Sequence, residues 1–445
     1  MISRELGWLQ VAALLVSASY GVGFLFGSGE LAVTHGMAGS LYPWLTALGM
    51  ALLAVSAGRV WMSRAPIWDM FGALYGAGVK RQVALLSLIW MTGVLAAQIH
   101  GGMAVLLLAG VPQSLALPIM LVLMFGAAQL DLQAASKVFS LCLLASSFVL
   151  VFSLVKMGGT HVYVEAVPRF GKDVQGMSVR ELVTMTLAIV FLVVTGADYQ
   201  QFVIAARSRT DAIVGCSLAA VCLLLLGALP ASTVIAAQHT GLLDGLLSAK
   251  QAIPAILSHA GPRWDAAMLM TLLAAALGSG AAIVRAMTSA LASVITPTTA
   301  SRRAGASLAV VLLGGIVAQR GQGIIQTMVE LNIVYVASVA PLFIFQSIGA
   351  HVPPNAAKKA IAAGFTAAAL LYVGEWAGLV RGQIELASLG IGTLASFAVL
   401  ETYRRKAAQS ACSRGHANQY VVNELSCIDR RERLVVTARV VRCIE

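Results

Sequence analysis

Long apolar runs, separated by short polar segments, occupy the chain from residue 8 to about residue 400. Each run approaches the ~20 residues that an α-helix needs to cross ~30 Å of hydrocarbon. They predict twelve membrane spans, numbered 1 to 12 in chain order, at about 8–31, 41–63, 84–110, 114–131, 136–157, 182–206, 211–236, 266–295, 305–319, 324–347, 358–380 and 384–402. The pattern therefore predicts an all-α integral membrane protein. Its transmembrane domain covers 1–403, and a polar tail covers 404–445, in which 434–442 resembles a strand more than a span.

Composition agrees with lipid as the outer solvent. Apolar residues make up 59% of the 445 residues and charged residues only 11%, and the mean hydropathy is +0.85. A soluble protein carries about 25% charged residues, so this chain has too little charge for a water-facing surface.

The chain has a net charge of +11, and its basic residues are distributed unevenly between the loops on the two sides of the membrane. The loops on the side of the N-terminus hold most of the basic residues, a positive-inside bias that places both termini in the cytoplasm. These residues are Arg64, Lys80, Arg81, Lys137, Arg207, Arg209, Arg302, Arg303, Lys358 and Lys359, with Arg404, Arg405 and Lys406 in the tail. We therefore expect a multi-pass membrane protein whose partner is the lipid bilayer and which binds no nucleic acid; a bacterial inner membrane is its expected location.

Two of the predicted spans contain glycine interruptions. Span 1 contains YGVGFLFGSGE (20–30), and span 6 contains TGADYQQ (195–201), where Gly196 lies beside Asp198. Unwound backbone at membrane depth is tolerated where it is buried or lines a cavity, and paired interruptions in two halves indicate a transporter's midplane site. The two interruptions lie five spans apart, an odd number, which predicts a five-plus-five inverted repeat with broken helices 1 and 6. The alternative is that the glycines only let helices pack closely.

Charged residues inside the predicted spans are candidate functional groups, because each costs at least ~2.5–3.5 kcal/mol at the bilayer centre. Asp198 in span 6 and Arg285 in span 8 have similar estimated depths, so we expect them to pair. The alternative for Arg285 is that its long stem reaches the interface. Glu330 lies in the outer half of span 10 and is also a candidate.

Several segments together resemble the sodium/solute symporter family. RELGW followed by FLFGSGELAVTHGM (24–37) resembles its first core helix, and AAQIHGG (96–102) fits its third. GADYQQFVIAARSRTDAIVG (196–215) is similar to the sixth core helix and the loop after it, and ALGSGAAIVRAMTSALASV (276–294) to the eighth. The resemblance covers about residues 4–345. It implies a leucine-transporter-type fold of the amino acid-polyamine-organocation superfamily, with alternating access driven by an ion gradient.

The resemblance also implies a sodium ion between the first and eighth core helices. The implied ligand positions are the carbonyl oxygens of Ser17, Tyr20 and Ala275 and the hydroxyl positions at Gly278 and Ser279. Two departures affect this site or its neighbourhood: Gly278 stands where the family has a serine or threonine, and Phe202 where it has an arginine. The helix that usually precedes the first core helix is also not expected here. Proton-coupled or uncoupled transport therefore stays open beside sodium coupling.

These observations predict an ion-coupled symporter that takes up a small organic solute between spans 1 and 6. The expected substrate cavity consists of Gly21, Phe24, Gln98, Asp198, Tyr199, Arg285 and Glu330. A membrane sensor with a transporter-like domain is the alternative from another class, although the tail has no kinase or receiver pattern. We expect no enzyme, because the chain has no phosphate-binding loop, histidine cluster or nucleophile arrangement, and no cofactor except Na⁺. The substrate and the oligomeric state are left open.

Overall fold

The computed structural model describes residues 4–21, 23–130, 132–246, 248–258, 265–294, 300–319, 324–350, 352–379 and 384–425. Over these residues the protein consists of helices, and it contains no β-strand. The α-helices are α1 (Trp8–Ser19), α2 (Ser28–His35), α3 (Leu41–Ser63), α4 (Ile67–Tyr75), α5 (Ala77–Leu108), α6 (Gln113–Gln129), α7 (Leu132–Lys156), α8 (Thr160–Val164), α9 (Ala166–Asp173), α10 (Val179–Thr195), α11 (Ala197–Ile204), α12 (Arg209–Leu226), α13 (Leu229–His239), α14 (Ala252–Ser258), α15 (Asp265–Val294), α16 (Ala300–Ala318), α17 (Ile324–Ser347), α18 (Pro354–Trp376) and α19 (Glu385–Leu425). The short turns are the π-turn η1 (Gly23–Gly27) and the 3₁₀ turns η2 (Gly36–Ser40), η3 (Val174–Gly176) and η4 (Ala249–Gln251).

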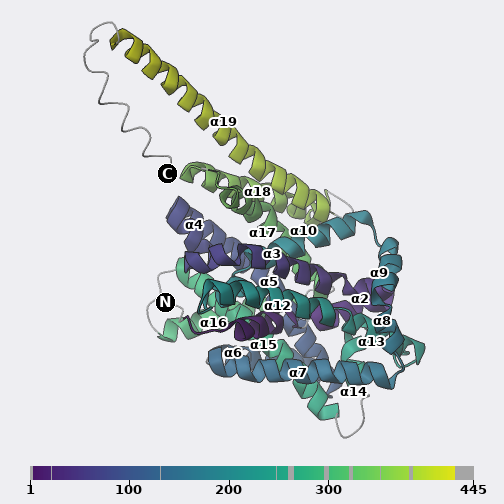
Figure 1. Cartoon of the computed structure of the whole chain (residues 1–445). Helices are drawn as coiled ribbons and strands as arrows, with labels where there is room; N and C mark the ends of the chain where they lie inside the picture. Colours follow the sequence, from purple (N-terminus) through teal and green to yellow (C-terminus); the bar gives the residue numbers. More distant parts are fainter. Residues whose placement is uncertain are drawn as a thin grey trace.

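These helices reproduce the twelve predicted spans. Eight helical runs in the described chain are long and apolar enough to cross a membrane, and four shorter apolar helices complete the set. Span 2 has its predicted bounds, whereas span 3 begins seven residues earlier, at Ala77, because its helix continues past the apolar run. Most of the spans lie side by side in one bundle (Figure 1).

Span 1 and span 6 are both broken, as the glycine pattern predicts. The α1 helix ends at Ser19, and the chain resumes through the π-turn η1 into α2. The α10 helix ends at Thr195, Gly196 is extended (φ −67°, ψ 122°), and α11 begins at Ala197. The sequence pattern did not predict the π-turn, whose wider winding lets the helix restart inside the bundle.

The packing of the two halves follows an inverted repeat. The α5 helix (span 3) packs against α16 and α17 (spans 9 and 10). Its counterpart five spans later, α15 (span 8), packs against α6 and α7 (spans 4 and 5). Likewise α1 packs against α12, and α10 against α3. These contacts therefore occur in equivalent pairs, which places the two broken spans at matching positions.

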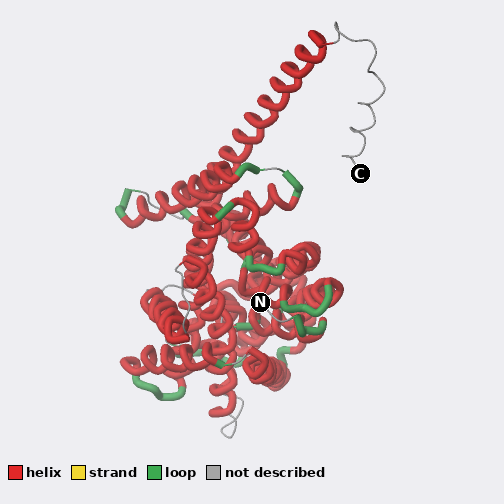
Figure 2. Tube along the Cα trace, turned by 90° about the vertical axis from the view of Figure 1, so that its left-hand side faces the viewer, coloured by secondary structure: helices red, strands yellow, loops and turns green. Residues whose placement is uncertain are grey.

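The last helix, α19, is longer than the predicted span 12. It continues to Leu425 and extends away from the bundle (Figures 1 and 2). Glu401 forms ion pairs with Arg404 (2.9 Å) and Arg405 (3.0 Å), at the i,i+3 and i,i+4 spacings that support a helix. The predicted boundary at residue 403 lies within this helix, and the strand-like segment 434–442 lies outside the described residues.

The chain segment before α1 is joined to the segment after α11. The backbone N–H groups of Glu5 and Leu6 both donate to the Ala205 carbonyl (3.1 Å each), and the Arg207 N–H donates to the Leu6 carbonyl (2.9 Å). The Trp61 indole of α3 donates to the Ala206 carbonyl (2.9 Å). We call residues 4–8 and 205–207 the N-terminal latch. It joins these segments at the end of the bundle where spans 1 and 6 meet, and we call this end the latch side.

Candidate transport site

The break of span 1 lies against span 8. The Ser279 hydroxyl of α15 donates to the Ala18 carbonyl of α1 (3.1 Å). A Cβ placed on Gly21 would lie 2.6 Å from Ser279 Oγ and 3.0 Å from Gln98 Oε1. Three residues predicted from the sequence, Gly21, Gln98 and Ser279, are therefore brought together from three different spans. Only glycine fits at position 21 without displacing its neighbours.

The five predicted ion ligands are located around this contact. A helix leaves its last carbonyl groups without intrahelical partners, and Ser17 and Ala18 lie in the last turn of α1, with Tyr20 as its C-cap. Ala275 and Gly278 lie on α15 within one turn before Ser279, and both are buried. The carbonyl that Ser279 contacts is that of Ala18, which lies in the chain between the two span 1 residues, Ser17 and Tyr20, whose carbonyls are predicted to bind the ion.

Side chains from span 10 fix the break of span 6. The Tyr335 hydroxyl of α17 donates to the Thr195 carbonyl (3.0 Å), and the Asn332 amide donates to the Ala188 carbonyl (2.9 Å). Gln200 of α11 donates to the Val194 carbonyl (2.9 Å). The predicted site did not include Tyr335 or Asn332. The sequence feature that could have indicated them is the presence of two polar side chains one turn apart in an otherwise apolar helix.

Asp198 is the charged residue nearest to the break of span 6. Its side chain is only 4% exposed, and its Oδ1 atom has no hydrogen-bond partner in the described part of the structure. A Cβ placed on Gly196 would lie 2.7 Å from Oδ1, so the carboxylate folds back over the break. Three tyrosines lie around it, Tyr42 of α3, Tyr199 of α11 and Tyr335 of α17.

The predicted pair between Asp198 and Arg285 is wrong. The Arg285 guanidinium instead donates to the carbonyl of Leu130 (2.8 Å), the C-cap of α6. A helix C-terminus offers carbonyl groups without intrahelical partners and the negative end of the helix dipole, which together attract a cation. Arg285 therefore binds at the latch-side end of α6, and the structure does not bring it to the predicted substrate cavity.

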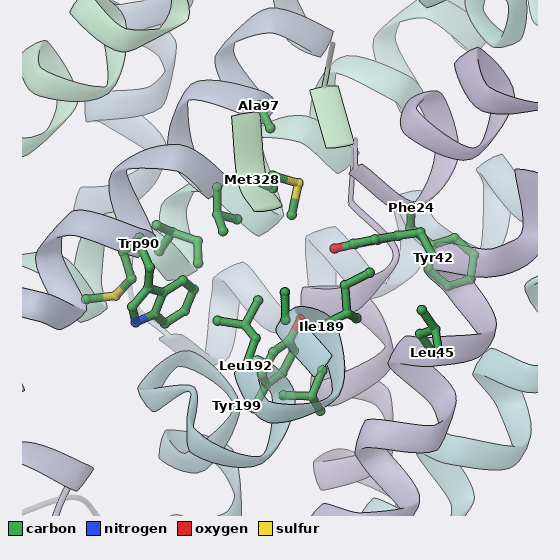
Figure 3. Packing of buried hydrophobic residues seen from close by; sticks show 14 of the residues in the cluster. Phe24, Tyr42, Leu45, Trp90, Ala97, Ile189, Leu192, Tyr199 and Met328 are labelled. Carbon is green, nitrogen blue, oxygen red and sulfur yellow. The ribbon is translucent and has the colours of Figure 1, made fainter. Parts of the chain in front are cut away.

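Aromatic and thioether groups surround the break of span 1 on its other side. The rings of Tyr20 and Phe24 lie 4.7 Å apart, and both are fully buried. A Cβ on Gly23 would lie 2.8 Å from Met328 Sδ and 3.6 Å from Tyr42 Oη. Figure 3 shows Phe24, Tyr42 and Met328 near Tyr199. Phe24 thus lies in the π-turn at the break of span 1, and Tyr199 lies in α11 directly after the break of span 6.

A cavity of about 460 Å³ opens at the end of the bundle opposite the latch. We call it the vestibule. Its walls come from α2, α10, α17 and the start of α19, and four glutamates and one arginine are among its lining residues: Glu30, Arg180, Glu181, Glu330 and Glu385. Glu330 therefore lies in the vestibule, above the breaks. The vestibule thus opens at one end of the bundle, and the N-terminal latch joins spans 1 and 6 at the other.

No family model and no curated protein sequence matches the chain. Solved structures do. A Na⁺-coupled sialic acid symporter, in a substrate-bound outward-open state, matches with a TM-score of 0.70 at 12% identity, over 91% of this chain and 90% of that one. A nucleobase-cation-symport-1 family transporter, in a closed conformation with bromovinylhydantoin bound, matches with a TM-score of 0.56 at 14% identity, over 92% and 94%. Together with the helix order, the broken spans and the reciprocal packing, these matches show that the chain has the all-α leucine-transporter-type fold that the sequence resemblance implied.

Proposed function

We propose that the protein is a secondary active transporter that takes up a small organic solute by alternating access, coupled to an ion. The observation that carries this proposal is the pair of broken helices between the vestibule and the N-terminal latch. Such breaks place backbone dipoles at the membrane centre, where transporters bind substrate and ions. The two similar structures support it, because both are transporters with ligand bound. We further propose that the protein lies in a bacterial inner membrane. The loop charges support an orientation with the latch side facing the cytoplasm.

For the coupling ion we propose Na⁺, bound where Ser279 meets the end of α1. Carbonyl groups at half-helix ends coordinate such cations in transporters. The Ser279 hydroxyl and the Ala18 carbonyl are 3.1 Å apart and joined by a hydrogen bond. An ion between α1 and α15 would break this bond and be coordinated by oxygen atoms of both helices. The sialic acid symporter, which is Na⁺-coupled, supports this assignment.

Binding of ²²Na⁺ to the purified protein tests the site without knowledge of the substrate. We expect saturable binding that excess Na⁺ competes away and excess K⁺ does not. Ser279→Ala should weaken it, because one hydroxyl oxygen is lost. Ser293→Ala on the same helix is the matched control, since its hydroxyl donates to the Ala290 carbonyl (2.7 Å), far along α15 from the break. Absence of Na⁺ binding to the wild-type protein would rule out sodium as the coupling ion.

Proton coupling is the second candidate, and Asp198 favours it. Acidic residues inside membrane spans often belong to proton relays, and Asp198 is buried there with no hydrogen-bond partner at Oδ1 among the described residues. Gly278 also leaves the ion site one hydroxyl short. Ligands found by a thermal-shift screen could then be tested in proteoliposomes under imposed Na⁺ or H⁺ gradients. Uptake that requires only the H⁺ gradient and is lost in Asp198→Asn would identify the proton as the coupling ion.

A further inference from the structure

A second cavity, of about 590 Å³, lies on the outside of the bundle between α5, α16, α17 and α18. We call it the lipid-side groove. Its walls are almost entirely apolar, and Leu85, Leu313 and Phe365 keep 49%, 43% and 37% of their surface exposed. All four helices are membrane spans, so the groove opens towards lipid rather than water. It is separate from the vestibule and shares no lining residue with it.

The length of the groove matches one leaflet of a bilayer. On α5 it runs from Gln82 to Thr92. Ten residues at 1.5 Å each span about 15 Å, which is half of the ~30 Å hydrocarbon thickness. A hydrocarbon chain that entered from the latch side would therefore fill the groove and end near the bilayer midplane.

Two basic residues lie at the latch-side end of the groove. Arg81 is one turn from the lining residue Leu85 on α5, and Lys358 is one turn from the lining residue Ala362 on α18, so each shares a helix face with the groove. The Lys358 side chain crosses to α5, where its Nζ lies 3.9 Å from the Cβ position of Gly78. Gly78 is three residues before Arg81, so the Lys358 side chain approaches the face of α5 that carries Arg81.

These two cations have no counter-charge within the described chain. Arg81 and Lys358 are exposed, and neither forms an ion pair or hydrogen bond there. The nearby carboxylate of Asp69 is paired with Lys80 instead (2.6 Å). Both α5 and α18 begin on this side, so their positive helix ends add to the field. An apolar groove of leaflet length that ends at two unpaired cations is complementary to an anionic amphiphile.

We propose that the groove binds an anionic glycerophospholipid, with one acyl chain between α5 and α18 and its phosphate at Arg81 and Lys358. Basic pockets between membrane helices are known to hold anionic lipid headgroups. The proposal does not depend on the transported solute or on the coupling ion.

Native mass spectrometry of the delipidated protein, titrated with phosphatidylglycerol or phosphatidylcholine, tests the site. We expect one phosphatidylglycerol to bind more tightly than phosphatidylcholine. Arg81→Gln and Lys358→Gln should each lower that affinity about fivefold, the equivalent of about 1 kcal/mol for one basic residue near an anionic surface. Lys137→Gln is the matched control: it is exposed near the latch-side start of α7, which does not line the groove.

A variant that fills the groove tests the acyl-chain part separately. Ala362→Trp should lower the first binding step for both lipids, because the indole takes the place of the chain. Equal affinity of the wild-type protein for the two lipids would overturn the proposal. An equal loss of phosphatidylglycerol affinity in Lys137→Gln would also overturn it, because it would indicate unspecific attraction of the lipid to the basic surface. A dimer that dissociates in Ala362→Trp would assign the groove to a second copy of the chain and would also overturn it.

Discussion

Replacing Gly21 by alanine should separate the break of span 1 from span 8. The added Cβ would lie 2.6 Å from Ser279 Oγ and 2.8 Å from Ser279 Cβ. Ordinary contacts between non-bonded atoms begin near ~3.5 Å, so one helix must move by several tenths of an ångström. Such overpacking costs about 1–3 kcal/mol in well-packed cores. We expect Gly21→Ala to lower the melting temperature in a size-exclusion thermostability assay and to weaken ²²Na⁺ binding.

A change at Ser279 shows whether the clash is the cause. Ser279→Ala removes only the hydroxyl oxygen, whereas Ser279→Gly removes both clashing atoms. The drop in melting temperature caused by Gly21→Ala should therefore be smallest in the Ser279→Gly background and intermediate in the Ser279→Ala background. Gly126→Ala on α6 is the control, since a Cβ there meets no atom within 4 Å and alanine favours the helix by up to about 1 kcal/mol. An equal cost of Gly21→Ala in all three Ser279 backgrounds would refute the reasoning.

Three further outcomes follow from the same contacts. Asp198→Asn should raise the melting temperature, because it removes a buried charge whose Oδ1 has no hydrogen-bond partner among the described residues. Its effect on stability should add to that of Arg285→Gln within ~0.5 kcal/mol, since the two side chains do not pair. Tyr335→Phe should lower the free energy of unfolding by about 1 kcal/mol through loss of its bond to the Thr195 carbonyl, and an unchanged stability would contradict that role. A reporter fused after Tyr403 should be active only in its cytoplasmic form, and periplasmic activity would reverse the proposed orientation.

The spans and their breaks were accessible from the sequence because lipid imposes a simple rule. Every span must be apolar over about 20 residues, and backbone can unwind only where protein or a cavity covers it. The glycines of span 1 and Gly196 in span 6 therefore mark the breaks without any knowledge of tertiary contacts. The family resemblance predicted in addition that Ser279 lies opposite the end of span 1, and the structure shows Ser279 in contact with the Ala18 carbonyl there.

The partners of long or polar side chains were not accessible in this way. Depth along a helix says that Asp198 and Arg285 lie at similar heights, but not which way each side chain points. Arg285 is long enough to reach the free carbonyl groups at the end of α6, and that direction depends on how α15 and α6 pack. The hydrogen bond from Tyr335 to Thr195 likewise requires the packing of α17 on α10, which no local pattern specifies.

The N-terminal latch has a practical consequence for work on this protein. Three of its hydrogen bonds are between backbone groups of residues 5–6 and 205–207, and each contributes about 0.5–1.5 kcal/mol. Their sum is enough to shift the populations of two conformers more than tenfold. An affinity tag or fluorescent protein attached ahead of Arg4 would enter this junction and compete with it. Probes attached beyond α19 are remote from residues 5–6 and 205–207 in the chain and would leave these hydrogen bonds intact.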